Sequence, residues 1–409
     1  MVLKLIIAII LCINIANAQE LKIVTPEEFL NQSPTEERSA ILDSIVHQFD
    51  GKSVTQKQLD NIWNDKKIRN KYKLIRFQIV NQKLYAGSFD ITHLYFVILL
   101  EYFQKFVKQY KIQDVDFIIH ASDEIIANSD IDFPSFIMSK DLDSPYEKNK
   151  LLIPDAYMVR KNWRELAERI KQSNKNKSWK NKINKVFWRG NASGGLEGTY
   201  QLSNFDKLPR LSLVLLSKLY PDIINARFTQ PIDSSFNQSS RDLAKILELL
   251  FGSDFQKVDP IEHLNYKYLI SIDGNTCAWE RVPWIMLSNS ILLKQETNKI
   301  EWFYKALKPY VHYVPVNKSL TNIFEQIQWM KENDPLLEKI SQNAQEFIIN
   351  NLMPQHIDSH MAIILNQYHN IQKDKRIIPT LEKSENAISL SSLLKNLLNR
   401  VIKYFTRWF

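Results

Sequence analysis

The spacing of hydrophobic residues alternates between two periods along most of the chain, which predicts an α/β fold. From Leu74 onward, the strand-like stretch RFQIVNQKLYAG precedes helical spacing over residues 93–110, and the apolar run DFIIHASD follows. A strand, a helix and a second strand in this order are typical of a parallel sheet. We therefore expect an α/β domain in the first half of the chain.

A second alternating block follows the first. The runs KVFWRG, YKYLISIDG, SILLKQ and VHYVPV have the character of strands, and residues 211–220 and 282–289 have helical spacing. Residues 324–372 are mostly helical in pattern. Two such blocks predict two Rossmann-like domains that face each other across a cleft.

Both ends of the chain carry hydrophobic segments of another kind. Residues 1–18 have one lysine before an apolar run that closes on the small-residue sequence ANA, as in a secretory signal peptide. An uncleaved anchor and a buried helix are the alternatives. Residues 390–409 place leucines and aromatic residues at helical spacing, with most cations off that stripe. This pattern favours a basic amphipathic helix on a membrane surface over a helix docked on the protein itself.

The composition narrows the classes of function. The 409 residues are 44% hydrophobic and 24% charged, which excludes collagen-like and wholly disordered chains. The formal net charge of +8 favours anionic partners such as nucleotides, phosphates or a membrane, without selecting one. Cys12 and Cys277 are the only cysteines, which excludes a zinc ribbon, an iron–sulfur site and a disulfide scaffold.

A basic run lies between the two blocks. Residues 169–185 contain seven cations and no acid. A nucleic-acid patch is one interpretation, but Trp179 is the only aromatic residue of the run on which a base could stack. We favour a solvated face at a domain junction and expect no nucleic-acid partner.

Ligands of open parallel sheets bind beyond the carboxyl ends of the strands, so the polar residues at those ends are the candidates for chemistry. Asp123 follows the strand FIIHAS and could act as a general base on a hydroxyl group. A turn or helix-cap aspartate is the alternative. Arg189 ends the strand KVFWRG and offers a planar set of donors that suits phosphate oxygens. Gly190 and Asn191 open a stretch of small residues where the backbone could approach a ligand, although a surface arginine before a turn would look the same.

The third strand end is the most informative. Asp273 and Gly274 close the strand, and Pro283 suits the first turn of a helix, so the helix should begin between Glu280 and Pro283. Residues 274–279 would then form a loop that leads into a helix N-terminus, where amides and Arg281 could bind an anion. The alternative is an ordinary strand–loop–helix connection with a solvent-facing arginine.

Taken together, one half offers a carboxylate and the other offers two positive features. This pairing suits displacement at a carbon that carries a diphosphate leaving group. Asp123 would accept the proton of the attacking hydroxyl, and Arg189, Arg281 and the loop amides would stabilise the departing diphosphate. The predicted anion-binding residues are Arg189, Gly190, Asn191, Gly274, Asn275, Thr276, Ala278 and Arg281.

Longer motifs resemble a known family. WKNKINKVFWRGN, YKYLISIDGNTCAWERVPWIMLSNSILLKQ and EWFYKALKPYVHYVPV resemble glycosyltransferase family 90, which includes capsule-associated proteins, Rumi-type protein O-glucosyltransferases and lipopolysaccharide-modifying enzymes. RFQIVNQKLYAG and DFIIHASD match the family's first domain in order. The resemblance covers roughly residues 70–370.

The resemblance implies a GT-B fold, a UDP-sugar donor, inversion at the anomeric carbon, no required metal and no cofactor. It also implies that Asp123 is the catalytic base, that Arg189 belongs to an F-R-G motif and that Gly274, Ala278 and Arg281 lie in a donor-binding loop. The expected reaction moves a glucose- or xylose-like sugar to a hydroxyl of a glycan, lipopolysaccharide or protein. A catalytically silent, membrane-associated sugar-binding protein that keeps the fold is the alternative.

With the resemblance, the expected organisation has five segments. These are a signal peptide (1–18), an N-terminal Rossmann-like acceptor-side domain (19–175), a C-terminal Rossmann-like UDP-sugar-binding domain (176–345), closing helices (346–375), and a linker with the basic amphipathic helix (376–409). We expect export through the secretory pathway and association with a membrane in a lumen or envelope.

A metal-dependent donor site is the remaining alternative. In the other main glycosyltransferase fold, a D-x-D motif can hold a divalent cation on a nucleotide-sugar diphosphate. The chain contains three such triplets, at Asp114/Asp116, Asp130/Asp132 and Asp141/Asp143. In a chain with 45 acidic residues this number is unremarkable, so the metal-free site is preferred.

Overall fold

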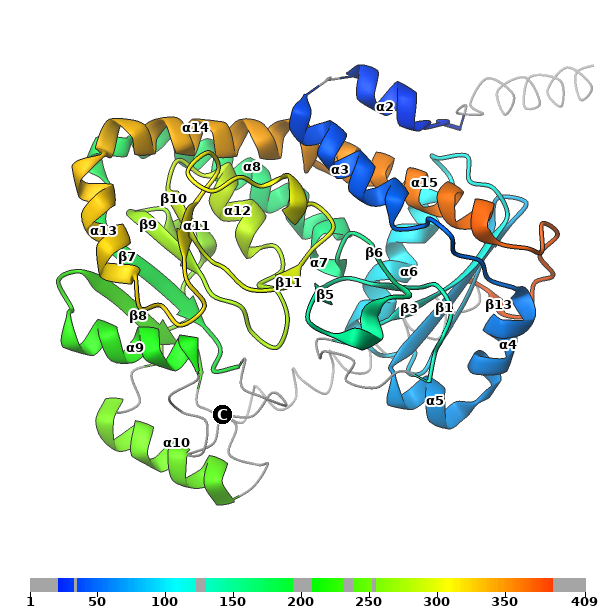
Figure 1. The fold of residues 1–409 in the computed structure, drawn as a ribbon, viewed down its shortest axis with the longest axis horizontal. Coiled ribbons are helices and arrows are strands. Elements are labelled where there is room, and N and C mark those ends of the chain that lie inside the picture. The colour runs from blue at the N-terminus through cyan, green and yellow to red at the C-terminus, as the bar shows by residue number, and fades with distance from the viewer. Residues whose placement is uncertain are drawn as a thin grey trace, which may run out of the picture.

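The computed structural model describes residues 21–32, 35–122, 130–193, 208–230, 238–251 and 255–384. Its elements form two α/β halves that lie side by side, each built around its own sheet (Figure 1). The strands of the first sheet come from residues 74–152 and 382–383, and those of the second from residues 183–316. The mixed α/β architecture with two main sheets agrees with the hydrophobic pattern, while the boundary between residues 175 and 176 stays a prediction.

The first sheet, on the right of Figure 1, is mixed. Its strands are β1 (Leu74–Val80), β2 (Lys83–Ser88), β3 (Val115–His120), β4 (Ser135–Ile137), β6 (Lys150–Leu152) and β13 (Glu382–Lys383). They are ordered β13-β2-β1-β3-β4-β6, with β3, β4 and β6 parallel and the other neighbours antiparallel.

The structure corrects the expectation of a parallel first sheet. The stretch RFQIVNQKLYAG forms two strands, because Asn81 and Gln82 adopt φ angles of 50° and 60° and turn the chain back on itself. β1 lies between β2 and β3 and is antiparallel to both, so β2 and β3 run in the same direction. The expected strand–helix–strand unit therefore exists as β2, α6 and β3, with β1 inserted between its strands.

Helices surround this sheet. They are α2 (Pro26–Gln32), α3 (Glu36–His47), α4 (Gln56–Asn64), α5 (Lys66–Lys71), α6 (Leu94–Phe106), α7 (Ala156–Val159) and α15 (Pro354–Ile371). The next helix after α7, α8 (Lys161–Asn176), lies in the other half of the molecule, where it contacts α11 (Pro260–His263) and α12 (Arg281–Leu287) (Figure 1). α3 and α15 lie next to each other beside the sheet (Figure 1). The buried Tyr368 of α15 donates to the carbonyl oxygen of Pro134 at 2.7 Å. The last long helix among the described residues therefore belongs to the first half of the molecule.

Polar side chains fix where several of these helices begin. Thr55 accepts a hydrogen bond from the backbone N–H of Gln58, whose side chain accepts one from the Thr55 N–H, so α4 starts with a capping box. The Thr35 side chain caps α3, and Asp155 caps α7. These caps satisfy backbone donors that have no partner inside the helix.

The second sheet, on the left of Figure 1, is entirely parallel. Its strands are β7 (Ile183–Gly190), β8 (Ile224–Phe228), β9 (Tyr266–Ser271), β10 (Ile291–Gln295) and β12 (Val314–Val316). The order is β12-β10-β9-β7-β8. The strands predicted from KVFWRG, YKYLISIDG, SILLKQ and VHYVPV are confirmed, whereas β8 was not foreseen.

Helices pack on both faces of the second sheet. They are α9 (Pro209–Leu219), α10 (Gln238–Phe251), α11 (Pro260–His263), α12 (Arg281–Leu287), α13 (Ile323–Glu332) and α14 (Asp334–Asn351). Short 3₁₀ turns lie at Trp179–Asn181 and Tyr304–Ala306, and a further one lies at Pro145–Glu147 in the first half. Side chains of β7 alternate between the faces. Trp188 packs with residues of α9 and α13, and Phe187 belongs to the core that contains Trp284 of α12. The second half is therefore a doubly wound parallel sheet.

A small antiparallel ladder joins the two halves. β5 (Lys140–Asp141) comes from the first half and pairs with β11 (Lys299–Ile300) of the second. The N–H of Leu142 extends the pairing to the carbonyl oxygen of Asn298 at 2.9 Å. Figure 1 shows both strands between the main sheets. One core cluster also contains Phe117 of the first sheet and Trp284 of α12, so the halves share buried hydrophobic surface.

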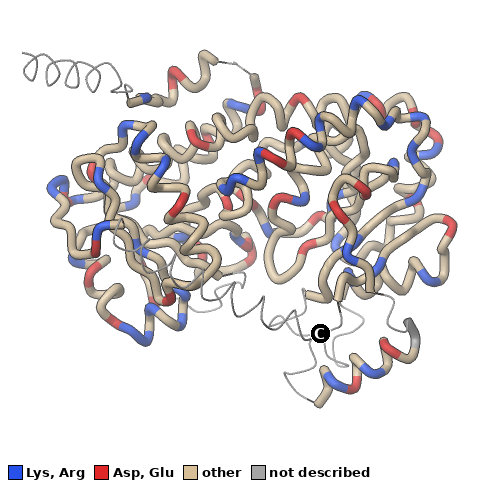
Figure 2. Tube along the Cα trace, turned by 180° about the vertical axis from the view of Figure 1, so that it is seen from behind, with Lys and Arg blue, Asp and Glu red and all other residues tan. Residues whose placement is uncertain are grey.

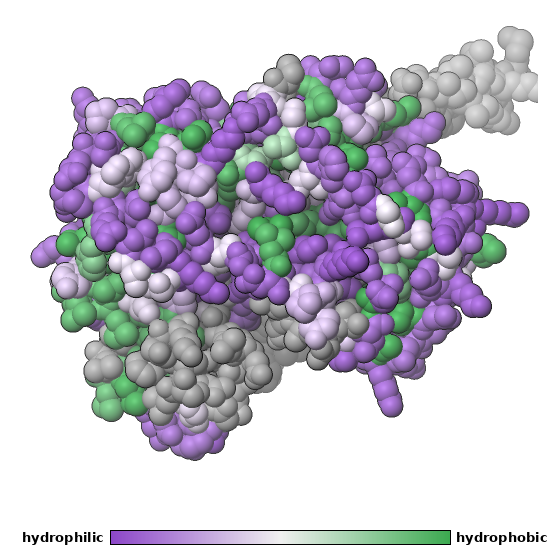
Figure 3. Space-filling view, in the orientation of Figure 1, coloured by the Kyte–Doolittle hydropathy of each residue, from purple (hydrophilic) through white to green (hydrophobic). Residues whose placement is uncertain are grey.

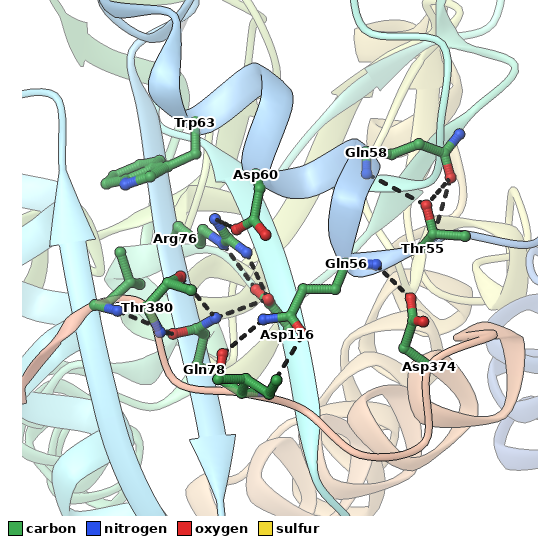
Figure 4. Close-up of polar contacts among 12 residues, drawn as sticks. Thr55, Gln56, Gln58, Asp60, Trp63, Arg76, Gln78, Asp116, Asp374 and Thr380 are labelled. Atoms are coloured by element: carbon green, nitrogen blue, oxygen red, sulfur yellow. Dashed lines mark hydrogen bonds and ion pairs between the residues drawn. The ribbon is translucent and has the colours of Figure 1, made fainter.

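A buried polar network stabilises the centre of the first sheet. Arg76 of β1 and Asp116 of β3 are both fully buried and form two hydrogen bonds of 2.8 and 2.6 Å (Figure 4). Asp60 of α4 lies 2.8 Å from the same guanidinium. Gln78 donates to Asp116 and accepts the N–H of Thr380 at 2.9 Å. The network thereby holds the segment after α15 against the sheet.

Charges of both signs occur along the helices of both halves (Figure 2), and hydrophilic residues cover most of the face in Figure 3. Within the described ranges, no helix combines the length and the apolar character needed to cross a membrane. The expected signal peptide at 1–18 and the amphipathic helix at 390–409 lie outside the described residues.

Candidate anion site at the carboxyl ends of two strands

The predicted anion-binding residues follow two neighbouring strands of the second sheet. β7 and β9 pair in parallel, with Phe187 opposite Leu269, so their carboxyl ends lie side by side. From β7 the chain crosses to β8 on one side, and after β9 it continues to β10 and β12 on the other. This reversal is the topological switch point, where open α/β sheets bind their ligands. Gly190, Asn191 and Gly274 therefore stand at the edge where a ligand is expected.

Arg210, which was not among the predicted anion-binding residues, connects the two strand ends. It lies in the first turn of α9 and is buried. Its Nη1 donates to the carbonyl oxygen of Asn191 at 3.0 Å and to Ser193 Oγ at 2.5 Å. Its Nη2 donates to the carbonyl oxygen of Ile272 at 3.0 Å. A second arginine thus brings a positive charge to the switch point.

Gly274 provides the space that this arginine occupies. A Cβ atom added to Gly274 would lie 2.9 Å from Arg210 Nη2, which real Cβ atoms essentially never do, and 3.0 Å from Ser193 Oγ, which is tighter than most real contacts. At Gly190, where a close approach of a ligand was expected, the side chain of Trp188 lies against the backbone. An added Cβ there would lie 2.5 Å from the indole ring of Trp188. Both glycines are therefore explained by packing around the site.

Arg281 is the predicted residue whose environment best suits an anion. α12 begins at Arg281, inside the predicted interval, and the half-buried guanidinium lies 5.8 Å from the centre of the Trp188 ring. Arg210 lies at the same distance from that ring. Within the described part of the chain, the Arg281 guanidinium has no hydrogen bond or ion pair.

The electrostatics of Arg281 follow from this position. Burial lowers the pKa of Arg281 to about 10, and the charge of Arg210 adds to that effect while Glu280 opposes it. Burial and the charges of Arg281 and Arg189 also lower the pKa of His263 to about 3, so this histidine is neutral near pH 7. A buried arginine beside a second positive charge, with no ion pair of its own among the described residues, is a favourable environment for a polyanion.

The loop between β9 and α12 is anchored at its start by a lysine. Lys299 Nζ donates to the carbonyl oxygens of Gly274 and Asn275 at 3.0 and 2.9 Å. The N–H of Gly274 donates to the carbonyl oxygen of Thr276, whose buried hydroxyl has no partner among the described residues. Ala278 accepts the N–H of Arg281 at 3.2 Å. The predicted loop residues thus form one compact turn beside the arginines.

Arg189 has a different environment from the one expected. Its side chain is buried and lies over the ring of Phe187 at 4.2 Å. Its N–H groups donate to Gln256 Oε1, to Asn225 Oδ1 and to the carbonyl oxygens of Trp188 and Asn225. These contacts connect the end of β7 with the start of β8 and with Gln256. Binding of a diphosphate by Arg189 therefore stays a prediction, and Arg210 and Arg281 are better placed for that role.

The predicted base, Asp123, lies outside the described residues, which stop at Ser122 and resume at Asp130. The strand that leads to it ends in a buried polar cluster. His120 Nε2 lies 2.9 Å from Ser135 Oγ and 3.3 Å from Lys150 Nζ. Burial, and then the charge of Lys150, lower the pKa of His120 well below its usual range. The strand end is therefore fixed by a neutral histidine and a buried lysine.

Residues of the D-x-D triplets and of the basic run contact other protein side chains instead of forming a metal site or a stacking surface in the described residues. Asp116 pairs with Arg76, and Asp130 pairs with Lys71 at 3.1 Å. In the ranges that the structure describes, no group of three or more His, Cys, Asp or Glu side chains could hold a metal ion. Trp179 of the basic run is buried and its Nε1 donates to Asp334, so this ring offers no surface for stacking a base.

Comparisons with known proteins give a consistent assignment. Residues 44–403 match the model of glycosyl transferase family 90. Protein O-glucosyltransferase 3 of Mus musculus is 35% identical over 207 residues, which are 51% of this chain and 36% of that protein. Protein O-glucosyltransferase 2 of Danio rerio is 29% identical over 197 residues, which are 48% of this chain and 35% of that protein. Protein O-glucosyltransferase 1 of Homo sapiens is 28% identical over 215 residues, which are 51% of this chain and 49% of that protein.

These relatives match about half of this chain, and the matched part spans half of their own length or less. The family model, by contrast, covers most of the 409 residues, including both sheets and the loop that carries Arg281. The chain belongs to glycosyl transferase family 90.

Proposed function

We propose that the protein is an inverting GT-B glycosyltransferase that moves a sugar from a UDP-sugar to a hydroxyl group. Membership of family 90 and the doubly wound second sheet beside a first α/β half support this proposal. The observation that carries it is the Arg281 guanidinium, which is held near Arg210 at the switch point without a hydrogen bond or ion pair among the described residues. Such an arrangement suits the diphosphate of a nucleotide sugar.

The proposed reaction is a single displacement at the anomeric carbon. The acceptor oxygen forms a bond to that carbon while the bond to the diphosphate oxygen breaks and its electron pair leaves with UDP. Arg210 and Arg281 stabilise the charge that develops on the diphosphate. Asp123 accepts the proton of the acceptor hydroxyl as general base. Since the two guanidinium groups supply positive charge, we propose that the reaction needs no metal and no cofactor.

The sugar and the acceptor are proposed as classes. The relatives are named as protein O-glucosyltransferases, which supports glucose or a similar sugar such as xylose as the transferred group. The acceptor class is a hydroxyl of a glycan, a lipopolysaccharide or a protein. We further propose that residues 1–18 direct export and that residues 390–409 hold the enzyme on a membrane surface in a lumen or envelope.

A panel of UDP-sugars tests the proposal. Each sugar nucleotide is added to the full chain, and thermal stabilisation and UDP release are measured with and without a chelator. We expect at least one UDP-sugar to stabilise the protein and to be hydrolysed or transferred, and we expect UDP release to be the same with and without the chelator. Manganese-dependent recovery of a chelated enzyme would contradict the metal-free mechanism.

The variant Asp123→Asn separates catalysis from binding. We expect it to bind UDP as the unchanged protein does and to lose about 10²–10⁴-fold in turnover, as is typical for removal of a general base. Turnover that stays within about tenfold would refute the base role of Asp123. Binding of a UDP-sugar with no turnover by the unchanged protein would favour the silent sugar-binding alternative.

A further inference from the structure

The loop that carries Arg281 contains a residue in a conformation that bulky side chains rarely adopt. Trp279 has a φ angle of 50°, in the left-handed region that favours glycine. Two residues later Arg281 begins α12, and its N–H closes a turn on the carbonyl oxygen of Ala278. The backbone of Trp279 therefore lies inside the turn that directs Arg281. Such conformations persist only where the surroundings determine them.

The surroundings of Trp279 come from the other half of the molecule. The ring of Tyr157, on α7, lies 6.2 Å from the Trp279 ring, and the ring of Tyr95, on α6, lies 6.5 Å from it. Tyr95 and Tyr157 also contact each other edge to face at 5.8 Å. These distances are typical of favourable aromatic pairs. Two tyrosines of the first half thus hold the tryptophan of the loop.

Polar contacts on either side of Trp279 cross between the halves in the same way. Glu280 lies 3.8 Å from Arg160 Nη2, and the Arg160 guanidinium lies 4.8 Å from the centre of the Tyr157 ring. On the other side, the Ser139 hydroxyl donates to Cys277 Sγ at 3.3 Å. The loop is therefore fixed at its start by Lys299 of its own half and from Cys277 to Glu280 by the first half.

We propose that Trp279 is a positioning residue through which the first half of the molecule sets the affinity for the donor diphosphate. Tyr95 and Tyr157 hold Trp279 in the left-handed conformation, and this conformation directs Arg281 toward the anion. The inference deepens the proposed function and rests on it. Residues that are remote from the diphosphate would then control donor binding without contacting the donor.

Two substitutions of Trp279 distinguish positioning from simple packing. Trp279→Ala and Trp279→Gly both remove the aromatic contacts, but only glycine adopts a positive φ without strain. We expect Trp279→Ala to weaken UDP binding about tenfold and Trp279→Gly only about threefold. If Trp279 contributed packing alone, alanine would bind UDP at least as tightly as glycine. Titration calorimetry with UDP gives the dissociation constants, and thermal unfolding checks that each variant is folded.

A matched pair of tyrosine variants tests the contribution of the first half. Tyr157→Ala removes a ring that contacts Trp279, whereas Tyr146→Ala removes an exposed ring of the same half. We expect weaker UDP binding for Tyr157→Ala and unchanged binding for Tyr146→Ala.

Three outcomes would count against the inference. Equal dissociation constants for the two Trp279 variants, or equal constants for Tyr157→Ala and Tyr146→Ala, would overturn it while leaving the proposed function intact. An unchanged protein that does not bind UDP would refute the proposed function, and the inference with it.

Discussion

Replacing Arg281 by glutamine should stabilise the ligand-free protein and weaken its binding of UDP. The pKa of Arg281 is lowered from 12.5 to about 10 by burial and by the charge of Arg210. Since the folded-state pKa lies below the unfolded one, the charged side chain costs stability at any pH below about 10, and the cost is complete at pH 7.

The magnitude follows from the same shift. At 1.36 kcal/mol per pH unit, the lowered pKa corresponds to at most about 3 kcal/mol against the charged form. Water screens part of this cost because the side chain is only half-buried. The contact with the Trp188 ring at 5.8 Å returns about 0.5–1 kcal/mol. We therefore expect Arg281→Gln to gain about 1–2 kcal/mol, which is a rise of a few degrees in Tm.

Thermal unfolding with and without UDP measures both effects. The unchanged protein should gain more in Tm from saturating UDP than Arg281→Gln does, because ligand stabilisation depends on affinity. The matched control is Arg241→Gln, which removes an exposed arginine of α10 and should change neither quantity. A lower Tm for ligand-free Arg281→Gln, or an undiminished UDP effect in that variant, would refute the reasoning.

Three further variants test other parts of the account. Asp155→Asn should raise the Tm above pH 7 and lose this gain near pH 4. Burial raises the pKa of Asp155 from 3.8 to about 7, so its charge begins to cost stability above about pH 4 and the full cost applies above pH 7; an equal gain at both pH values would contradict this. Asp116→Asn should lower the free energy of unfolding in urea by about 3 kcal/mol, since Arg76 would keep its buried charge with fewer partners; a loss below about 1 kcal/mol would contradict a structural role. Gly274→Ala should leave the Tm nearly unchanged but weaken UDP binding about tenfold in calorimetry, because the added Cβ displaces Arg210; unaltered binding would mean that Arg210 does not contact the donor.

The hydrophobic pattern predicted the second sheet better than the first. Its strands β7, β9 and β10 are largely buried runs that each end near Gly, Asp or Gln. The hydrophobic run and the residue that ends it therefore mark the same strand boundary. The strand β8 has alternating burial at the edge of the sheet, and its sequence INARF gives a weak signal. The hairpin of β1 and β2 was missed because its turn, Asn81-Gln82, contains no glycine.

The site was predicted in part, for a similar reason. Gly274 and Arg281 lie directly after a strand, so their place at its carboxyl end follows from the sequence. Arg210 lies on α9, the helix that follows β7, and it reaches Ile272 at the end of β9 only because β7 and β9 are neighbours in the sheet. Strand order of this kind is not visible in a hydrophobic pattern. Nor does the pattern show that the side chain of Arg189 turns toward Asn225 and Gln256.

The signal that could have found Arg210 is its position after Pro209. A proline followed by an arginine in the first turn of a crossover helix places a cation near the strand ends of a parallel sheet. Arg281 was predicted in a similar way, because Pro283 marks the first turn of its helix and places Arg281 at the helix start. Applying this reasoning to every helix that follows a strand would have given both arginines.

A crystal structure of the protein with UDP tests the central claim most directly. We expect diphosphate oxygens within hydrogen-bond distance of the guanidinium groups of both Arg210 and Arg281, at the ends of β7 and β9. A diphosphate bound elsewhere, or one that contacts neither arginine, would contradict that claim.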